Sequence, residues 1–246
     1  MRKRSLALLA FCSFLVLSVC EPTLLYGRDY PAEFERGKTA LETGRIDEAL
    51  SIFSQLISAD PQAQYYYYRG LALGAKAKDS QAIEDLNKAI SLDPKQAIYY
   101  FRRGIALLRN GMPQEAVDDF TKAVDLEPEQ SQVLGYRARA LFKLNRMQQA
   151  LQDLARSIQL NPNNGALYAL RGDILSASGD HANAVRDYDR AIQLRPNDPT
   201  VYNNRGIAFA NLGRTREALE DLNTAMDLAT VMPLPSQGPS SSGSHW

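Results

Sequence analysis

The sequence predicts an all-α protein in which helical hairpins stack into a solenoid. The main observation is a repeat, because five prolines follow one another at steps of 33, 34, 34 and 34 residues (Pro61, Pro94, Pro128, Pro162 and Pro196). Glycines keep the same period, at Gly37, Gly70, Gly104, Gly172 and Gly206, with Ala138 where one more would fall. Self-similarity at a fixed period of this length is the sequence signature of repeat architectures.

One unit, residues 97–130, shows how each repeat folds. Small residues at Gly104 and Ala116 allow two helices to approach closely, while Tyr100 and Phe120 fill the space beside them at helical spacing. The segment 111–113, Gly-Met-Pro, breaks the first helix and begins the second, because proline suits a first helical turn. We expect successive hairpins to share one continuous apolar interior.

The repeat defines the domain organisation. Residues 1–29 are predicted to be a signal peptide and short linker, and residues 233–246, rich in Pro, Ser and Gly, a disordered tail. Between them, at 30–232, we count six units: 30–62, 63–96, 97–130, 131–164, 165–198 and 199–232. Places within a unit are counted below from its first residue.

These residues resemble the tetratricopeptide repeat (TPR) family over most of the chain. The family pattern has an aromatic residue at place 4, Gly at place 8, Ala at place 20, a large apolar residue at place 24, Ala at place 27 and Pro at place 32. Every unit has the alanine of place 20: Ala49, Ala82, Ala116, Ala150, Ala184 and Ala218. Departures include Glu33, Leu56, Ser157 and Thr230. The resemblance implies a right-handed superhelical solenoid of about six helix-turn-helix units.

A second regularity predicts ion pairs. Arginine precedes the glycine place in all six units, and five of the six carry aspartate at one place of the second helix (Asp85, Asp119, Asp153, Asp187 and Asp221), whereas the first unit has Ile52 there. A guanidinium can bind both oxygens of a carboxylate. We therefore expect structural bridges within or between units.

The resemblance also implies a concave groove lined by the first helices. The groove places hold aromatic, apolar and basic residues, which are predicted to bind a protein or peptide with apolar and acidic residues. The alternative for the aromatic residues is plain packing. The predicted peptide-binding residues are Tyr67, Tyr68, Leu71, Phe101, Arg102, Ile105, Tyr136, Arg139, Phe142 and Lys143.

Composition and motifs argue against several other functions. The 28 basic and 28 acidic residues balance, so no overall basic field favours nucleic acid. The two histidines, His181 and His245, lie apart, and no nucleophile motif, phosphate-binding loop or metal cluster is present, so we expect no catalysis, cofactor or metal. The carboxylate-binding pattern of chaperone-binding TPR proteins is missing.

The N-terminus has the layout of a secretory signal. Three basic residues at 2–4 precede an apolar run from Leu6 to Val19, which is short for a membrane span. The segment ending at Cys20 resembles a bacterial lipoprotein box, in which this cysteine would be lipidated. The alternatives are ordinary cleavage further on, near Gly27, and an uncleaved anchor.

Together these features predict an exported TPR scaffold or adaptor in the periplasm or cell envelope, either freely secreted or anchored to the membrane by a lipid on Cys20. The alternative function is a structural or assembly subunit that uses the ends of the solenoid for protein association, self-association included.

Overall fold

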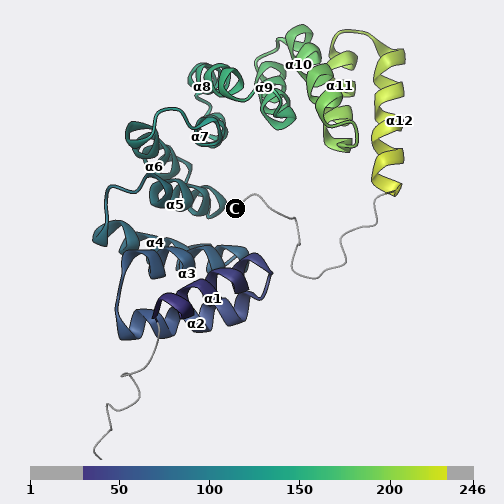
Figure 1. Ribbon diagram of the computed structural model, residues 1–246. Helices are drawn as coiled ribbons and strands as arrows, with labels where there is room; N and C mark the ends of the chain where they lie inside the picture. Colours follow the sequence, from purple (N-terminus) through teal and green to yellow (C-terminus); the bar gives the residue numbers. More distant parts are fainter. Residues whose placement is uncertain (1–29, 232–246) are drawn as a thin grey trace, which may run out of the picture.

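The computed structural model describes residues 30–231, which contain twelve α-helices and no strand. The predicted signal, Cys20 and the tail 233–246 lie outside these residues. The helices form six antiparallel pairs in an arc, and α5, α7 and α9 lie nearer its inside than α6, α8 and α10 (Figure 1). Their bounds are α1 Tyr30–Glu42, α2 Ile46–Ala59, α3 Ala63–Ala75, α4 Asp79–Leu92, α5 Ala97–Arg109, α6 Pro113–Leu126, α7 Ser131–Lys143, α8 Met147–Leu160, α9 Gly165–Ala177, α10 His181–Leu194, α11 Pro199–Asn211 and α12 Thr215–Val231.

The turn within each hairpin has the same backbone conformation at one position. Place 15 has positive φ in every unit, at Gly44, Ala77, Gly111, Asn145, Gly179 and Gly213. Glycine reaches this left-handed region without strain, and asparagine tolerates it. In the third unit α5 ends at Arg109 and α6 begins at Pro113, as the sequence predicts.

Close packing of the paired helices depends on the small residue at place 8. A β-carbon built on Gly104 would lie 2.6 Å from Cε1 of Phe120, and one on Gly172 would lie 2.7 Å from Cε1 of Tyr188. The alanines at place 20 are buried as well, with at most 4% exposure. Backbone therefore packs against an aromatic ring where two larger side chains would collide.

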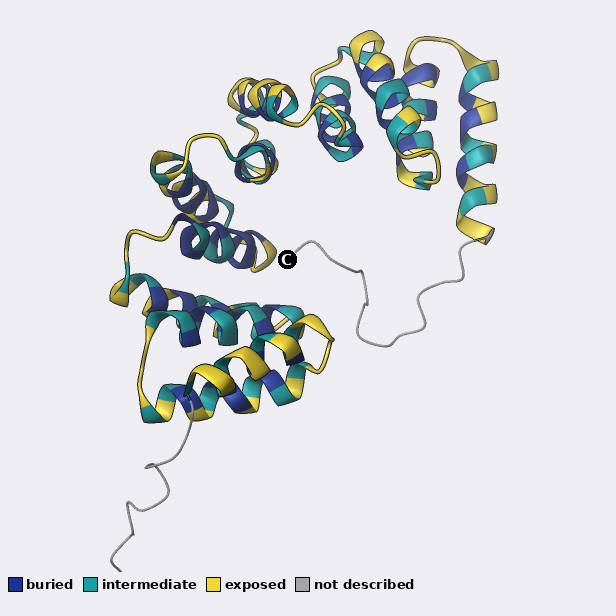
Figure 2. Cartoon of the chain, in the orientation of Figure 1, coloured by how far each residue is buried: buried dark blue, intermediate teal, exposed yellow. Residues whose placement is uncertain are grey.

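The apolar interior runs between neighbouring helices along the stack. Within residues 30–231 the buried residues form four clusters, of which the largest extends from α5 to α9 and another joins repeats five and six. Partly buried residues connect three of these clusters, because Tyr68 belongs to two of them and Ile90 and Ile98 to two of them as well. Buried residues gather where neighbouring helices face each other, and exposed residues occupy loops and outward faces (Figure 2).

The predicted ion pairs form within units, and a further bond joins neighbouring units. In the third unit, Nε and Nη2 of Arg103 donate to the two carboxylate oxygens of Asp119 at 2.7 and 2.6 Å, and Nη1 donates to Oδ1 of Asn87 in the preceding unit at 2.6 Å. The same two-pronged pairing joins Arg69 to Asp85, Arg137 to Asp153, Arg171 to Asp187 and Arg205 to Asp221.

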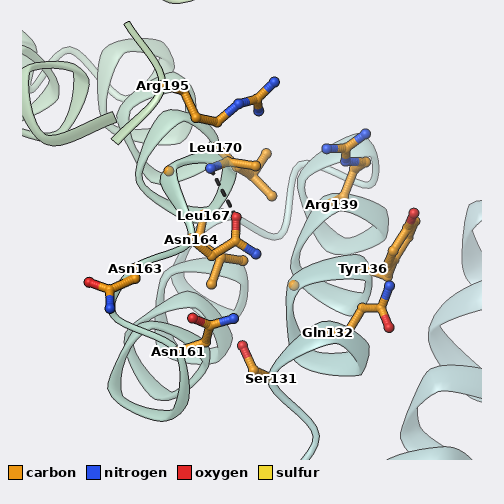
Figure 3. A pocket seen from close by; sticks show the side chains of 13 residues that line it. Ser131, Gln132, Tyr136, Arg139, Asn161, Asn163, Asn164, Leu167, Leu170 and Arg195 are labelled. Atoms are coloured by element: carbon orange, nitrogen blue, oxygen red, sulfur yellow. Dashed lines mark hydrogen bonds between the residues drawn. The ribbon is translucent and has the colours of Figure 1, made fainter. Parts of the chain in front are cut away.

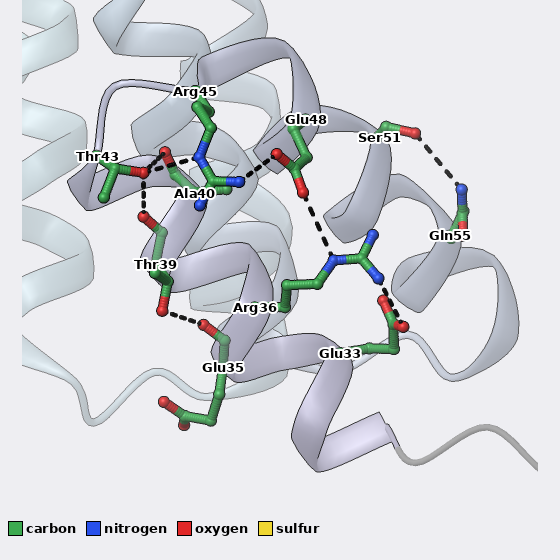
Figure 4. Close-up of polar contacts among 10 residues, drawn as sticks. All are labelled: Glu33, Glu35, Arg36, Thr39, Ala40, Thr43, Arg45, Glu48, Ser51 and Gln55. Atoms are coloured by element: carbon green, nitrogen blue, oxygen red, sulfur yellow. Dashed lines mark hydrogen bonds and ion pairs between the residues drawn. The ribbon is translucent and has the colours of Figure 1, made fainter.

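The first unit differs, because Ile52 replaces the aspartate. Arg36 turns to Glu33 at 2.9 Å and to Glu48 at 3.6 Å instead, and its side chain is 55% exposed (Figure 4). The arginine before place 8 pairs with a buried aspartate in the other five units, but in the first unit it makes only surface contacts.

The departure at Ser157 is also compensated. Its fully buried hydroxyl donates to the backbone oxygen of Ser131 at 2.7 Å, and the hydroxyl of Ser131 donates to the backbone oxygen of Ser157 at 2.9 Å. A buried polar group needs such partners, so the two serines act as one unit.

Candidate functional site

The ten predicted groove residues lie on α3, α5 and α7, but their exposure differs. Arg139 and Lys143 are exposed, whereas Tyr68, Leu71, Arg102, Tyr136 and Phe142 are half-buried. Tyr67, Phe101 and Ile105 are buried, with 9%, 2% and 7% exposure. These last three belong to the packed interior rather than to an open groove surface.

The aromatic residues at place 5 explain this burial, because each reaches toward the next unit. The ring centroids of Phe34 and Tyr68 are 5.2 Å apart, those of Tyr67 and Tyr99 are 4.9 Å apart, and those of Phe101 and Tyr136 are 5.5 Å apart. Aromatic pairs at these distances stabilise packing. Burial raises the pKa of the Tyr67 hydroxyl, as expected for a phenol in this setting.

Around Arg102 there is little room for a ligand. The hollow that Leu71, Arg102 and Ile105 help to line measures about 20 Å³. Nε and Nη1 of Arg102 are buried there, and its guanidinium lies 5.4 Å from the Phe101 ring centroid. A space of this size admits about one water molecule, not a peptide side chain.

The aromatic series ends at Gly135, which occupies place 5 of the fourth unit. Glycine contributes no side chain here, and a cavity of about 720 Å³ opens between α7 and α9 (Figure 3). It is lined by Ser131, Gln132, Gly135, Tyr136, Arg139, Asn161, Asn163, Asn164, Gly165, Ala166, Leu167, Leu170 and Arg195. We call it the α7–α9 cavity.

The walls of the α7–α9 cavity differ in chemistry. Helix α7 contributes Tyr136 and Arg139, α9 contributes Leu167 and Leu170, and the α8–α9 loop contributes asparagines at one end (Figure 3). Among the asparagines, Asn164 accepts a hydrogen bond from the backbone nitrogen of Ala166 at 3.1 Å and so caps α9. An apolar wall with amide and cationic groups around it is the usual make-up of a binding pocket.

Two arginines, Arg139 and Arg195, line this cavity, and they differ in their ion pairs. The Arg139 guanidinium lies 6.0 Å from the Tyr136 ring centroid, and it forms no salt bridge with any residue of the described range 30–231. Arg195, by contrast, pairs with Asp198 at 3.2 Å. The Asp173 carboxyl, whose charge lies within electrostatic range of Arg139, is held by Tyr188 and Asn204, and burial raises its pKa.

The residues predicted from the sequence include only part of this site. Of the predicted residues, the cavity brings together Tyr136 and Arg139, whereas Phe142 and Lys143 on the same helix are not among its lining residues. The glycine at place 5 and the Asn-rich linker 161–164 are the signals that sequence reasoning missed. A missing side chain is easily overlooked when a groove is identified from the side chains that are present.

Two further kinds of feature, a metal cluster and a membrane-spanning helix, are absent from the described residues. No group of three or more His, Cys, Asp or Glu side chains within 30–231 is placed to hold a metal ion. None of the helices in this range combines the length and apolar character required to span a bilayer.

Comparison with family models decides the family. One model described as "TPR repeat" matches residues 75–111 and 172–213, and three models described as "Tetratricopeptide repeat" match residues 32–63, 101–165 and 199–230. The chain belongs to the tetratricopeptide repeat family. Its twelve described helices thus form a superhelical TPR solenoid, as predicted. TPR scaffolds of this type are generally not enzymes.

Solved structures resemble this TPR protein along most of their own length. MamA is 23% identical, covering 66% of this chain and 95% of its own, with a TM-score of 0.61. MamA from Desulfovibrio magneticus RS-1 is 20% identical, covering 69% and 96%, with a TM-score of 0.64. YrrB, described as a TPR protein with an unusual peptide-binding site, is 25% identical, covering 72% and 92%, with a TM-score of 0.60. No curated protein matches this TPR sequence.

Proposed function

We propose that this TPR protein is an exported scaffold that binds a peptide segment of a protein partner in the α7–α9 cavity. The observation that carries the proposal is a 720 Å³ cavity whose wall holds the Arg139 guanidinium, which has no salt bridge to any residue of 30–231. The likeness to YrrB, described by its peptide-binding site, supports a peptide as the class of ligand.

The cavity chemistry specifies the peptide. An apolar side chain would pack on Leu167 and Leu170, and a neighbouring acidic side chain would pair with Arg139, since a guanidinium binds a carboxylate with two parallel hydrogen bonds. Exposed amides at Gln132 and Asn163 can bond to the peptide backbone. The proposed ligand is therefore an extended segment with alternating apolar and acidic residues.

The test is fluorescence anisotropy with a labelled peptide of alternating Leu and Glu, compared with the same peptide carrying Gln for Glu. We expect the Glu peptide to bind more tightly than the Gln peptide. Arg139→Gln should lower the affinity for the Glu peptide about tenfold or more, because it removes a charge-assisted hydrogen bond of about 1.5–3 kcal/mol. Arg156→Gln is the matched control, because it removes the same charge from a side chain that is 53% exposed on α8. Equal binding of both peptides, or equal weakening by both variants, would contradict the proposal.

Export rests on the sequence alone. The basic residues 2–4 and the apolar run 6–19 support secretion to the periplasm or cell envelope, and Cys20 is the proposed lipid attachment point. Mass spectrometry of the mature N-terminus separates the outcomes: a diacylated cysteine confirms the anchor, a free N-terminus beyond Gly27 indicates a soluble product, and an intact Met1 contradicts cleavage.

A further inference from the structure

The last described helix, α12, exposes an apolar surface. The corresponding surface is covered on the second helix of each of the five preceding units. Leu219 and Met226, at places 21 and 28 of the sixth unit, are 57% and 67% exposed. The residues at these places in the five preceding units are buried or half-buried: Leu50, Ile83, Val117, Leu151 and Val185, and Ile57, Ile90, Val124, Ile158 and Ile192. We call Leu219, Met226 and the surface between them the α12 face.

The chain itself shows what covers such a face. Val185 and Ile192 on α10 belong to one apolar cluster with Val201 and Ala208 on the following first helix, α11. The first helices α3, α5, α7, α9 and α11 all carry a buried large apolar residue at place 3 and a buried alanine or isoleucine at place 10: Tyr65 and Ala72, Tyr99 and Ala106, Val133 and Ala140, Leu167 and Ile174, Val201 and Ala208. The complementary element is thus a helix with a large apolar residue and, mostly, an alanine seven residues later.

The length of α12 strengthens the match. It has 17 residues, against 14 in each of α2, α4, α6, α8 and α10, and Thr230 stands where the earlier units have proline. The α12 face is therefore at least as long as the surfaces on which first helices pack inside the solenoid.

We infer that the α12 face binds an amphipathic helix from another protein, which carries the place-3 and place-10 pattern and extends the solenoid by one helix. Two other occupants fit less well. The first helix of a second copy, α1, presents Ala32 and Thr39 at these places, without a large apolar residue. The sequence after α12, residues 232–246, contains neither alanine nor isoleucine and therefore lacks the place-10 residue of the pattern.

A stapled peptide with the α11 sequence, residues 199–211, is a suitable probe. The staple is needed because an isolated helix of this length is marginal in water. The probe should bind the full chain saturably in methyl NMR and shift the signals of Leu219 and Met226. The same peptide with Val201→Asp should bind at least tenfold more weakly, because it places a charge on the apolar seam.

Variants of the protein locate the probe. Leu219→Glu/Met226→Glu should weaken binding at least tenfold, whereas Leu92→Glu, at a leucine that is 45% exposed on α4, should leave it unchanged. Arg139→Gln should also leave it unchanged, which separates this surface from the α7–α9 cavity. Equal binding of both peptides, or shifts outside α11 and α12, would overturn the inference.

Two further results would assign the face to another occupant and also overturn the inference. One is a dimer in sedimentation that Leu219→Glu/Met226→Glu converts to a monomer, which indicates a second copy. The other is probe binding that appears only after residues 232–246 are removed, which indicates the segment following α12.

Discussion

Tyr188 donates its phenolic hydrogen to Oδ1 of Asp173 at 2.9 Å, and the same oxygen accepts a hydrogen bond from Nδ2 of Asn204 at 2.9 Å. Tyr188 occupies place 24, the large packing residue of the fifth unit, and Asn204 belongs to the sixth. The carboxylate therefore links the interior of one repeat to the first helix of the next. Burial raises the pKa of Asp173, although both hydrogen bonds oppose the rise.

The first prediction concerns this charge. Asp173→Asn keeps an oxygen that can accept both hydrogen bonds and removes a carboxylate whose ionisation burial disfavours. Because the folded-state pKa lies above the unfolded value, the wild-type protein loses stability as pH rises through the folded-state pKa. We expect the variant to be the more stable protein at neutral pH, by an amount that shrinks as pH falls below the unfolded value.

Urea unfolding of both proteins at pH 7 and in the acidic range measures this difference. Asp227→Asn, at an exposed residue of α12, is the control and should change the free energy of unfolding by no more than about 0.5 kcal/mol. A variant less stable than wild type at neutral pH would show instead that the negative charge itself stabilises the fold, for example through Arg139.

The second prediction concerns the arginine–aspartate pairs. The Asp119 side chain is 8% exposed, so Arg103→Ala would leave a buried carboxylate without its cation. We expect a loss of about 3–5 kcal/mol in the free energy of unfolding, the range for breaking a buried pair. Arg36→Ala is the matched change in a unit whose arginine is 55% exposed, and it should cost no more than about 0.5 kcal/mol. Similar small losses in both variants would mean that solvent screens all the pairs alike.

The third prediction concerns the contact between Gly104 and Phe120. Gly104→Ala places a β-carbon against the ring, and overpacking of this kind costs about 1–3 kcal/mol. The fourth unit has Ala138 with Leu154, both fully buried, which shows that alanine fits when place 24 is leucine. In the background of Phe120→Leu, Gly104→Ala should therefore cost at least about 1 kcal/mol less. A double-mutant cycle by urea unfolding measures the coupling, and purely additive effects would exclude the steric explanation.

The repeat period was enough to predict the fold from the sequence. The candidate site could not be predicted in the same way, because it depends on features of single units that the repeat does not share. The spacing of proline, glycine and alanine placed the helices, because each unit faces the same packing problem. The same spacing could not tell whether the Phe101 side chain points into the groove or packs against Tyr136 of the next unit, because the groove and the next unit both face the same side of α5. Ser131 and Ser157 are a second example, because their mutual hydrogen bonds join residues 26 positions apart.

The fourth prediction uses the glycine that opens the α7–α9 cavity. A β-carbon on Gly135 would lie 2.8 Å from Cδ2 of Leu167, about as close as the corresponding contact at Gly104. Here, however, the neighbouring atom is the end of a flexible side chain beside a 720 Å³ cavity, so Leu167 can move aside. Alanine also favours a helix over glycine by about 1 kcal/mol.

Gly135→Ala should accordingly change the free energy of unfolding by no more than about 1 kcal/mol, while Gly104→Ala is clearly destabilising. The displaced Leu167 side chain occupies part of the cavity, so the same variant should bind the Leu–Glu peptide more weakly although its stability is preserved. Parallel urea unfolding and fluorescence anisotropy separate the two effects. A strongly destabilised Gly135→Ala protein would show that the wall of the cavity is as rigid as the interior around Phe120, and that the cavity is not adaptable to a ligand.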